Sequence, residues 1–360
     1  MRSLINGKIE PGRSVFFWFA FAAAAVVMAV LPFEIGRYTL LNFNSFLLMT
    51  FLAAGLSLLW GFGGVLSLGQ SAFFGIGGYA YGIIVINLSS GGWSSLAGLI
   101  GGLLTATVVA AVLGWLVFYV RLRGVYVGIV TLVVTLVIET FLNQTAGPQW
   151  VVGSAHLGGN NGLGRFSGDI QQLSSLTIPW GAHDFTFMGS SKAFYYLLLG
   201  LMLVSYFCLR ILVNSRFGIA LTAIREDPDR AESIGYDVRL LQTVAFSIGA
   251  LLAALSGILY VSWGNFITPS VFGVNANILP VIWVAVAGRK SIAASMVGAV
   301  VLQWGAQALA IQGQYALIIQ GALLVLAVLL LPDGILSLGP GMSRLRLPSR
   351  RTTGSVALRR

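Results

Sequence analysis

The densest group of charged side chains in this 360-residue chain lies in one short stretch, 216–237, that carries both signs. We expect Asp229 or a near neighbour to be the N-cap of a short helix there. Such a helix could dock in a groove on a soluble partner, with Ala231, Ile234 and Tyr236 supplying apolar contact. A solvated connecting loop is the other interpretation. The residues assigned to docking are Arg216, Ala223, Arg225, Glu226, Asp227, Asp229, Arg230, Glu232 and Gly235.

Polar side chains inside apolar runs are the second group. Gln70 and Ser71 stand in a glycine-rich apolar run, where an unpaired polar group costs several kcal/mol. Glu139 is the only acidic residue deep in a predicted span, and intramembrane carboxylates usually face the bundle interior. These residues are assigned to a substrate path or gate. Helix packing, and for Glu139 simple access to water near its helix end, are the other interpretations.

Two polar stretches outside the apolar runs complete the substrate-path assignment. Asn160 and Asn161 lie in the run Gly158-Gly-Asn-Asn-Gly-Leu. Asn265 and Thr268 lie in a segment that we expect to break a helix at the external side. We assign all of them to the outer part of the same path.

Catalytic and metal-binding patterns are absent from the sequence. No G-x-x-x-x-G-K-[ST] phosphate loop occurs, so we expect no ATPase site and no cofactor in this chain. The histidines His156 and His183 and the single cysteine Cys208 are widely separated, which predicts no metal site. No Ser-His-Asp grouping stands out, and we do not expect an enzyme.

Composition places these residues in a membrane protein. Hydrophobic residues make up 57% of the chain and charged residues only 9%, whereas soluble domains have about 25% charged residues. The net charge of +10 is spread in short clusters between apolar runs, which argues against nucleic-acid binding and is typical of loops on the cytoplasmic side. The sequence therefore predicts an all-α, polytopic transmembrane bundle.

The positions and orientation of the spans follow from the apolar runs and the basic residues. About ten spans, with eight or nine possible, are predicted near 15–32, 40–60, 66–88, 95–119, 124–142, 193–213, 240–262, 276–287, 291–310 and 315–331. The third is polar and glycine-rich and the eighth is short, so either could be broken or re-entrant. With both termini in the cytoplasm, all 21 basic residues except Arg37, Arg165 and Lys192 lie inside.

The domain organisation that follows is simple. A transmembrane domain spans 1–338, with an external loop at 143–192 and a cytoplasmic segment at 214–239. The basic, Pro- and Ser-containing tail, 339–360, is predicted to be disordered.

From about 40 to 338 the sequence resembles the LivM-type permeases of branched-chain amino acid importers and their UrtC-type relatives in urea transport. The resemblance rests on the order and spacing of short motifs, each weak alone. They are Leu66-Ser-Leu-Gly-Gln-Ser-Ala-Phe-Phe, Arg123-Gly-Val-Tyr, Gly158-Gly-Asn-Asn-Gly-Leu, Ser215-Arg-Phe-Gly, Ala223-Ile-Arg-Glu-Asp, Ala231-Glu-Ser-Ile-Gly and Leu331-Pro-Asp-Gly-Ile.

The resemblance implies a permease subunit of an ABC importer in the bacterial inner membrane. It implies a heterodimer with a LivH- or UrtB-type permease, two cytoplasmic ATPase subunits that bind ATP and Mg²⁺, and a solute-binding protein outside. Segment 216–237 would then be the element that docks on an ATPase.

The motifs Gly158-Gly-Asn-Asn-Gly-Leu and Val281-Ile-Trp-Val-Ala-Val-Ala-Gly-Arg look closer to the urea branch, although Ala287 and Lys290 stand where glycines are expected. Urea or a short amide is therefore the first substrate expectation, and branched-chain amino acids are the alternative. A secondary transporter or channel that needs no ATPase is the rival of another class. That rival would be expected to show internal repeats and more intramembrane carboxylates.

Overall fold

The computed structural model describes residues 9–10, 15–88, 93–164, 173, 175–180, 183–310 and 321–322. Its helices are α2 (Val15–Glu34), α3 (Arg37–Leu56), α4 (Gln70–Asn87), α5 (Trp93–Tyr119), α6 (Val125–Asn143), α7 (Lys192–Asn214), α8 (Arg216–Glu226), α9 (Pro228–Ser233), α10 (Val238–Gly264), α11 (Val274–Ala287) and α12 (Ile292–Ala310). A π-helical turn, η1 (Ser57–Phe62), extends α3, and η2 (Gly159–Asn161) and η3 (Pro269–Phe272) are single 3₁₀ turns.

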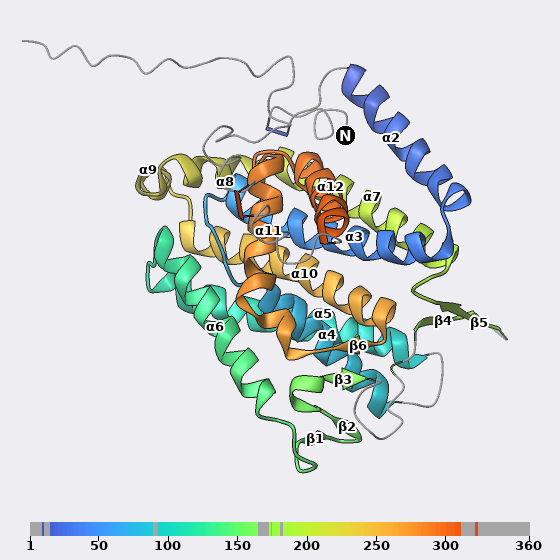
Figure 1. Ribbon diagram of the computed structural model, residues 1–360. Helices are drawn as coiled ribbons and strands as arrows, with labels where there is room; N and C mark the ends of the chain where they lie inside the picture. Colours follow the sequence, from blue (N-terminus) through green and yellow to red (C-terminus); the bar gives the residue numbers. More distant parts are fainter. Residues whose placement is uncertain are drawn as a thin grey trace, which may run out of the picture.

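Helix α10 lies at the centre of the bundle. α10 packs against α3, α4 and α5, and α4 also packs against α5 (Figure 1). A Cβ added at Gly55 of α3 would lie 2.6 Å from the carbonyl oxygen of Gly249 in α10. The two backbones therefore touch, which glycine alone permits at this crossing.

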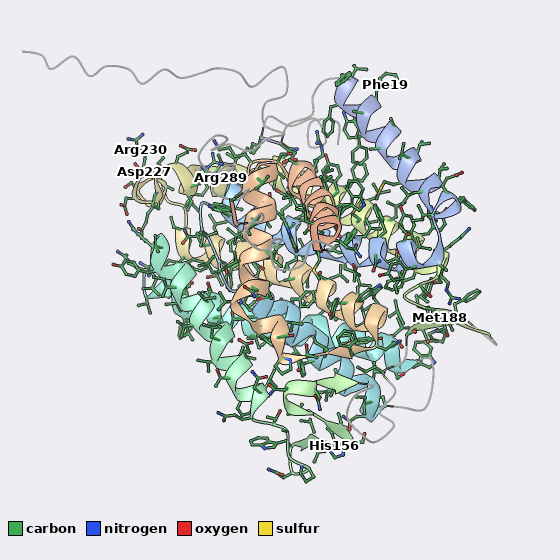
Figure 2. All side chains as sticks on the ribbon, in the orientation of Figure 1. Phe19, His156, Met188, Asp227, Arg230 and Arg289 are labelled. Atoms are coloured by element: carbon green, nitrogen blue, oxygen red, sulfur yellow. The ribbon has the colours of Figure 1, made fainter. Side chains whose placement is uncertain are left out.

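The outer helices expose apolar side chains to the surroundings. α2 lies at the edge of the bundle, and Phe19 on it is 73% exposed (Figures 1 and 2). Trp115 of α5 and Val137 of α6 are likewise exposed. A lipid environment accounts for these surfaces, because lipid-facing side chains have no need to be polar.

The structure confirms a polytopic helical membrane bundle. Seven helices in the described part of the chain are long and apolar enough to cross a membrane. The third and eighth predicted spans correspond to α4, which begins only at Gln70, and to α11, which has 14 residues. The predicted span at 315–331 and the tail at 339–360 lie outside the described residues, apart from 321–322.

The external loop contains short antiparallel ladders that the all-α prediction did not include. β1 (Val151–Val152) pairs with β2 (Ala155–His156), and β4 (Leu176–Trp180) pairs with β5 (His183–Phe187). β3 (Leu163–Gly164) pairs with β6 (Phe266–Ile267), which follows α10. The last ladder ties the long loop to the segment that leads into α11.

The two ends of the bundle carry different residues. Asp227, Arg230 and Arg289 lie at one end, and His156 lies at the opposite end, beside the β1–β2 ladder (Figure 2). The charge distribution assigns the first end to the cytoplasm. The charged segment 216–237 and the loop that carries the predicted outer path residues are therefore at opposite ends of the bundle.

Candidate coupling segment and membrane site

The charged stretch forms two short helices, not the single one predicted. The Ser215 hydroxyl accepts the backbone N–H of Phe217 at the start of α8. Asp227, with Pro228 after it, is the N-cap of α9, and its carboxylate accepts the backbone N–H of Arg230. The N-cap predicted at Asp229 or a near neighbour is therefore Asp227, and Asp229 lies in the first turn of α9.

Most charges of this segment have partners within the chain. Arg123, in the turn between α5 and α6, donates hydrogen bonds of 2.7 and 3.0 Å to the two carboxylate oxygens of Asp229. These bonds lower the pKa of Asp229 and raise that of Arg123. Glu232 lies 3.5 Å from Arg121 and 3.7 Å from Arg239. The charged side chains that we assigned to docking therefore hold α9 against the rest of this chain.

The outward face of the segment is mixed. Arg216, Ala223, Arg230 and Gly235 are exposed, and Gly235 has a φ of 98°, which ends α9 in a left-handed turn. Ile219, Ile234 and Tyr236 are 54%, 72% and 40% exposed. Ala231 is only 2% exposed, because it packs inward, so its predicted contact with a partner is wrong.

Arg225 joins the charged segment to η1 and to the stretch that leads from η1 into α4. The guanidinium of Arg225 donates a 2.6 Å hydrogen bond to the carbonyl of Gly61, at the end of η1, and also binds Glu226. A Cβ added at Gly64 would lie 2.7 Å from Cγ of Arg225. A displacement of α8 would therefore move the segment that leads into α4.

Helix α4 begins inside the bundle. Gln70, its first residue, is 2% exposed, and neither amide atom of its side chain has a hydrogen-bond partner among the described residues. Its Nε2 would lie 3.4 Å from a Cβ added at Gly249 of α10. The free N–H groups of a helix start give this position positive electrostatic potential.

Helix α11 begins beside α4, with its first residue, Val274, exposed and Asn277 in its first turn buried. The Ser71 hydroxyl donates a hydrogen bond to Oδ1 of Asn277, and Nδ2 of Asn277 donates to the carbonyls of Phe272 and Gly273. The sequence analysis missed Asn277. The sequence feature that could have identified Asn277 is a polar amide side chain within the short eighth apolar run.

Glu139 approaches the same turn from α6. A Cβ added at Gly273, the N-cap of α11, would lie 3.1 Å from a carboxylate oxygen of Glu139. The structure thus brings Ser71 and Glu139 together around the first turn of α11. Gln70 faces α10 from the neighbouring helix start.

The outer candidates form a separate layer. Asn160 and Asn161 are exposed in η2, which packs against η3. Asn265 ends α10 in the left-handed region with a φ of 55°, and Thr268 hydrogen-bonds Ser270 at 2.7 Å. These residues lie next to the β3–β6 ladder, whereas Gln70 and Ser71 start α4 and Glu139 lies in α6, one of the candidate membrane spans.

The described residues contain no group of three or more His, Cys, Asp or Glu side chains that could hold a metal ion.

Comparison with known proteins gives a consistent family. The family model described as "Branched-chain amino acid transport system / permease component" matches residues 38–328. The permease protein LivM of the high-affinity branched-chain amino acid transport system of Escherichia coli K12 is 28% identical over 329 residues, covering 88% of this chain and 74% of that protein. The corresponding LivH of Salmonella typhimurium is 25% identical over 309 residues, covering 79% of this chain and 90% of that protein. No solved structure matches. The chain belongs to the branched-chain amino acid transport permease family and is a multi-pass protein of the plasma membrane.

Proposed function

We propose that this chain is one of two related permease subunits of an ATP-driven importer and carries branched-chain amino acids. The names of the LivM and LivH relatives support the substrate and the pairing. A solute-binding protein would deliver the substrate at the end that carries η2 and η3. Two cytoplasmic ATPase subunits, which bind ATP and Mg²⁺, would dock at the end that carries α8 and α9.

The connection from α8 to α4 supports a mechanical role for the docking segment. An ATPase would contact the exposed side chains of Ile219, Ile234 and Tyr236. The Arg225 bond to Gly61 would then carry the displacement into the segment before Gln70. Movement of α4 would alter the Ser71–Asn277 contact and with it the start of α11.

The two helix starts inside the membrane domain are the observation that carries the substrate proposal. A helix start favours an anionic group, and broken helices of transporters use such starts to hold substrate carboxylates. Gln70, Ser71 and Asn277 supply hydrogen-bonding atoms beside them. An amino acid carboxylate fits this arrangement as the path opens, and the apolar surroundings suit its side chain.

Urea is the second candidate, and a separate observation favours it. The motifs that begin at Gly158 and Val281 are closer to the urea branch of the wider family. The amide of Gln70 and that of Asn277 would also suit a small neutral amide. No charge is needed for such a solute.

Uptake decides between the two substrates. Cells that lack this chain, and the same cells complemented, are tested with labelled leucine and with labelled urea at low concentration. We expect leucine uptake to depend on the chain and urea uptake not to. The reverse result would replace the amino acid proposal with the urea one, and dependence of neither would refute both.

A further inference from the structure

A cavity of about 140 Å³ lies behind the docking segment, between α9 and the turn that joins α5 to α6. It is lined by Gly63, Gly64 and Val65, by side chains of α8 and α10, and by the turn itself. A water molecule occupies about 30 Å³ in the liquid, so the cavity has room for several waters or for one tetrahedral oxyanion.

Its charged lining is mostly cationic. Four arginines and one carboxylate contribute to the wall, namely Arg121, Arg123, Arg225, Arg239 and Glu232. Asp229 engages Arg123 with two short hydrogen bonds, and Glu226 engages Arg225 at 2.6 Å. Arg121 and Arg239 are left to share Glu232.

The two ion pairs that Glu232 makes are longer than close hydrogen bonds. The distances from Glu232 to Arg121 and Arg239 are 3.5 and 3.7 Å, whereas a close guanidinium–carboxylate hydrogen bond has about 2.7–2.9 Å. Within the lining, four guanidinium groups face one carboxylate, so the wall carries an excess of positive charge that Asp229 and Glu226 offset in part from outside it. Guanidinium groups bind phosphate oxygens in a bidentate manner, so this excess suits a phosphate group.

The backbone of the turn also holds Arg121 in an uncommon conformation. Its φ of 63° lies in the left-handed region, which non-glycine residues rarely adopt. Such local strain concentrates at functional sites.

The neighbours of the cavity point to a lipid as the source of the phosphate. Val120, Val125 and Tyr126 flank the arginine turn and are 69%, 75% and 68% exposed. Apolar side chains beside exposed arginines, at the end assigned to the cytoplasm, are typical of the level at which phospholipid headgroups meet acyl chains.

We propose that this cavity binds the phosphate of an anionic phospholipid and that Arg121 and Arg239 are its ligands. The bound phosphate draws the α5–α6 turn and α10 together behind α9 and braces the docking segment. The binding is a property of the isolated chain, so its test does not depend on the transport activity proposed above.

The test uses the full-length chain, purified in an uncharged detergent. Its thermal unfolding midpoint is measured with phosphatidylglycerol, with phosphatidylcholine and with inorganic phosphate. We expect phosphatidylglycerol to raise the midpoint more than phosphatidylcholine does, and Arg121→Gln combined with Arg239→Gln to remove most of that difference. Arg216→Gln, which removes an exposed arginine that does not line the cavity, is the matched control and retains the difference.

Inorganic phosphate distinguishes the two possible sources of the bound phosphate group, which are a phospholipid headgroup and a free phosphate ion. A rise with phosphate alone that is lost in the double variant supports the phosphate site and identifies a free anion as the ligand. The proposal is overturned if the unfolding midpoints of wild type, double variant and control rise equally. It is also overturned if neither phosphatidylglycerol nor phosphate raises the midpoint of the wild-type chain.

Glu232→Gln keeps the test decisive if the double variant does not fold. Removing the shared carboxylate releases both arginines, so phosphatidylglycerol should act at a lower concentration than in the wild-type chain. Weaker or unchanged binding in this variant contradicts the assignment of Arg121 and Arg239.

Discussion

At the scale of single residues, the Ser71–Asn277 hydrogen bond is the contact that best defines the membrane site. It joins the starts of α4 and α11, and both residues are 2% exposed. The bond satisfies the Ser71 hydroxyl and Oδ1 of Asn277, which would otherwise be buried without a partner. Gln70, one residue earlier, has no such partner among the described residues, which favours a role beyond packing.

Removing the Ser71 hydroxyl tests this contact. Ser71→Ala leaves Oδ1 of Asn277 without its donor, at a cost of about 1–3 kcal/mol, and we expect substrate uptake to fall several-fold while the protein still reaches the membrane. Ser247→Ala is the matched control, because the Ser247 hydroxyl bonds only a carbonyl of its own helix. Equal uptake by the two variants would contradict a special role for Ser71.

Glu10 is a buried carboxylate that the sequence analysis did not single out. Its Oε1 accepts the backbone N–H of Ile292, at 3.0 Å, and the Ser291 hydroxyl, at 3.2 Å, at the start of α12. The backbone N–H groups of Ile9 and Glu10 donate to Asn214 at the end of α7. Burial raises the pKa of Glu10 to about 7, although Arg210 opposes the shift.

This shift predicts how stability depends on pH. The folded chain holds the proton of Glu10 more tightly than the unfolded chain, so its stabilisation is complete below pH 4.5 and is lost as the pH rises through about 7. At about 1.4 kcal/mol per pKa unit, the loss is roughly 3 kcal/mol. Glu10→Gln should flatten this dependence in thermal unfolding of the purified chain.

The exposed carboxylate of Glu34 provides the control for that measurement. Glu34→Gln should leave the wild-type slope unchanged. If Glu10→Gln and wild type lost stability equally between pH 4.5 and pH 7, Glu10 would not be the group responsible.

At the scale of elements, the hydrogen bond from Arg225 to the carbonyl of Gly61 joins α8 to η1. Arg225→Gln removes that bond and the ion pair with Glu226. In the assembled importer we expect ATP hydrolysis to continue while the substrate carried per ATP falls. Arg37→Gln is the control, because Arg37 lies outside the docking segment and hydrogen-bonds Ser190. If the Arg225→Gln variant carried as much substrate per ATP as wild type, coupling through the bond from α8 to η1 would be excluded.

The apolar face of the same segment gives a prediction about assembly. Ile234 is 72% exposed, so Ile234→Asp should fold normally but lose apolar contact with an ATPase. We expect less ATPase to co-purify with this variant than with wild type. Val152→Asp, at an exposed position of the external loop, should leave the yield unchanged. Full recovery of the ATPase with Ile234→Asp would remove this face from the docking site.

The sequence predicted the elements better than it predicted their contacts. Long apolar runs located the helices, and the polar third run corresponds to α4, which begins only at Gln70. The ion pairs of Arg121 and Arg123 with α9 could not be predicted, since they join residues more than 100 positions apart. For the same reason the pairing of Ser71 with Asn277 was invisible before the fold was known.

At the scale of the whole molecule, the bundle presents a docking segment at one end and small β-ladders at the other (Figure 1). Between them, two helices start within the membrane domain and touch through polar side chains. This arrangement fits a subunit that receives motion on one side and substrate on the other.

The most direct test of the central claim is transport by the purified complex in proteoliposomes. The chain is isolated with the subunits that co-purify with it, and labelled leucine uptake is measured with a solute-binding protein, with and without ATP and Mg²⁺ on the ATPase side. We predict that ATPase subunits co-purify and that uptake occurs only with ATP. Uptake by the isolated chain without ATP would contradict the importer account and establish a secondary transporter or channel.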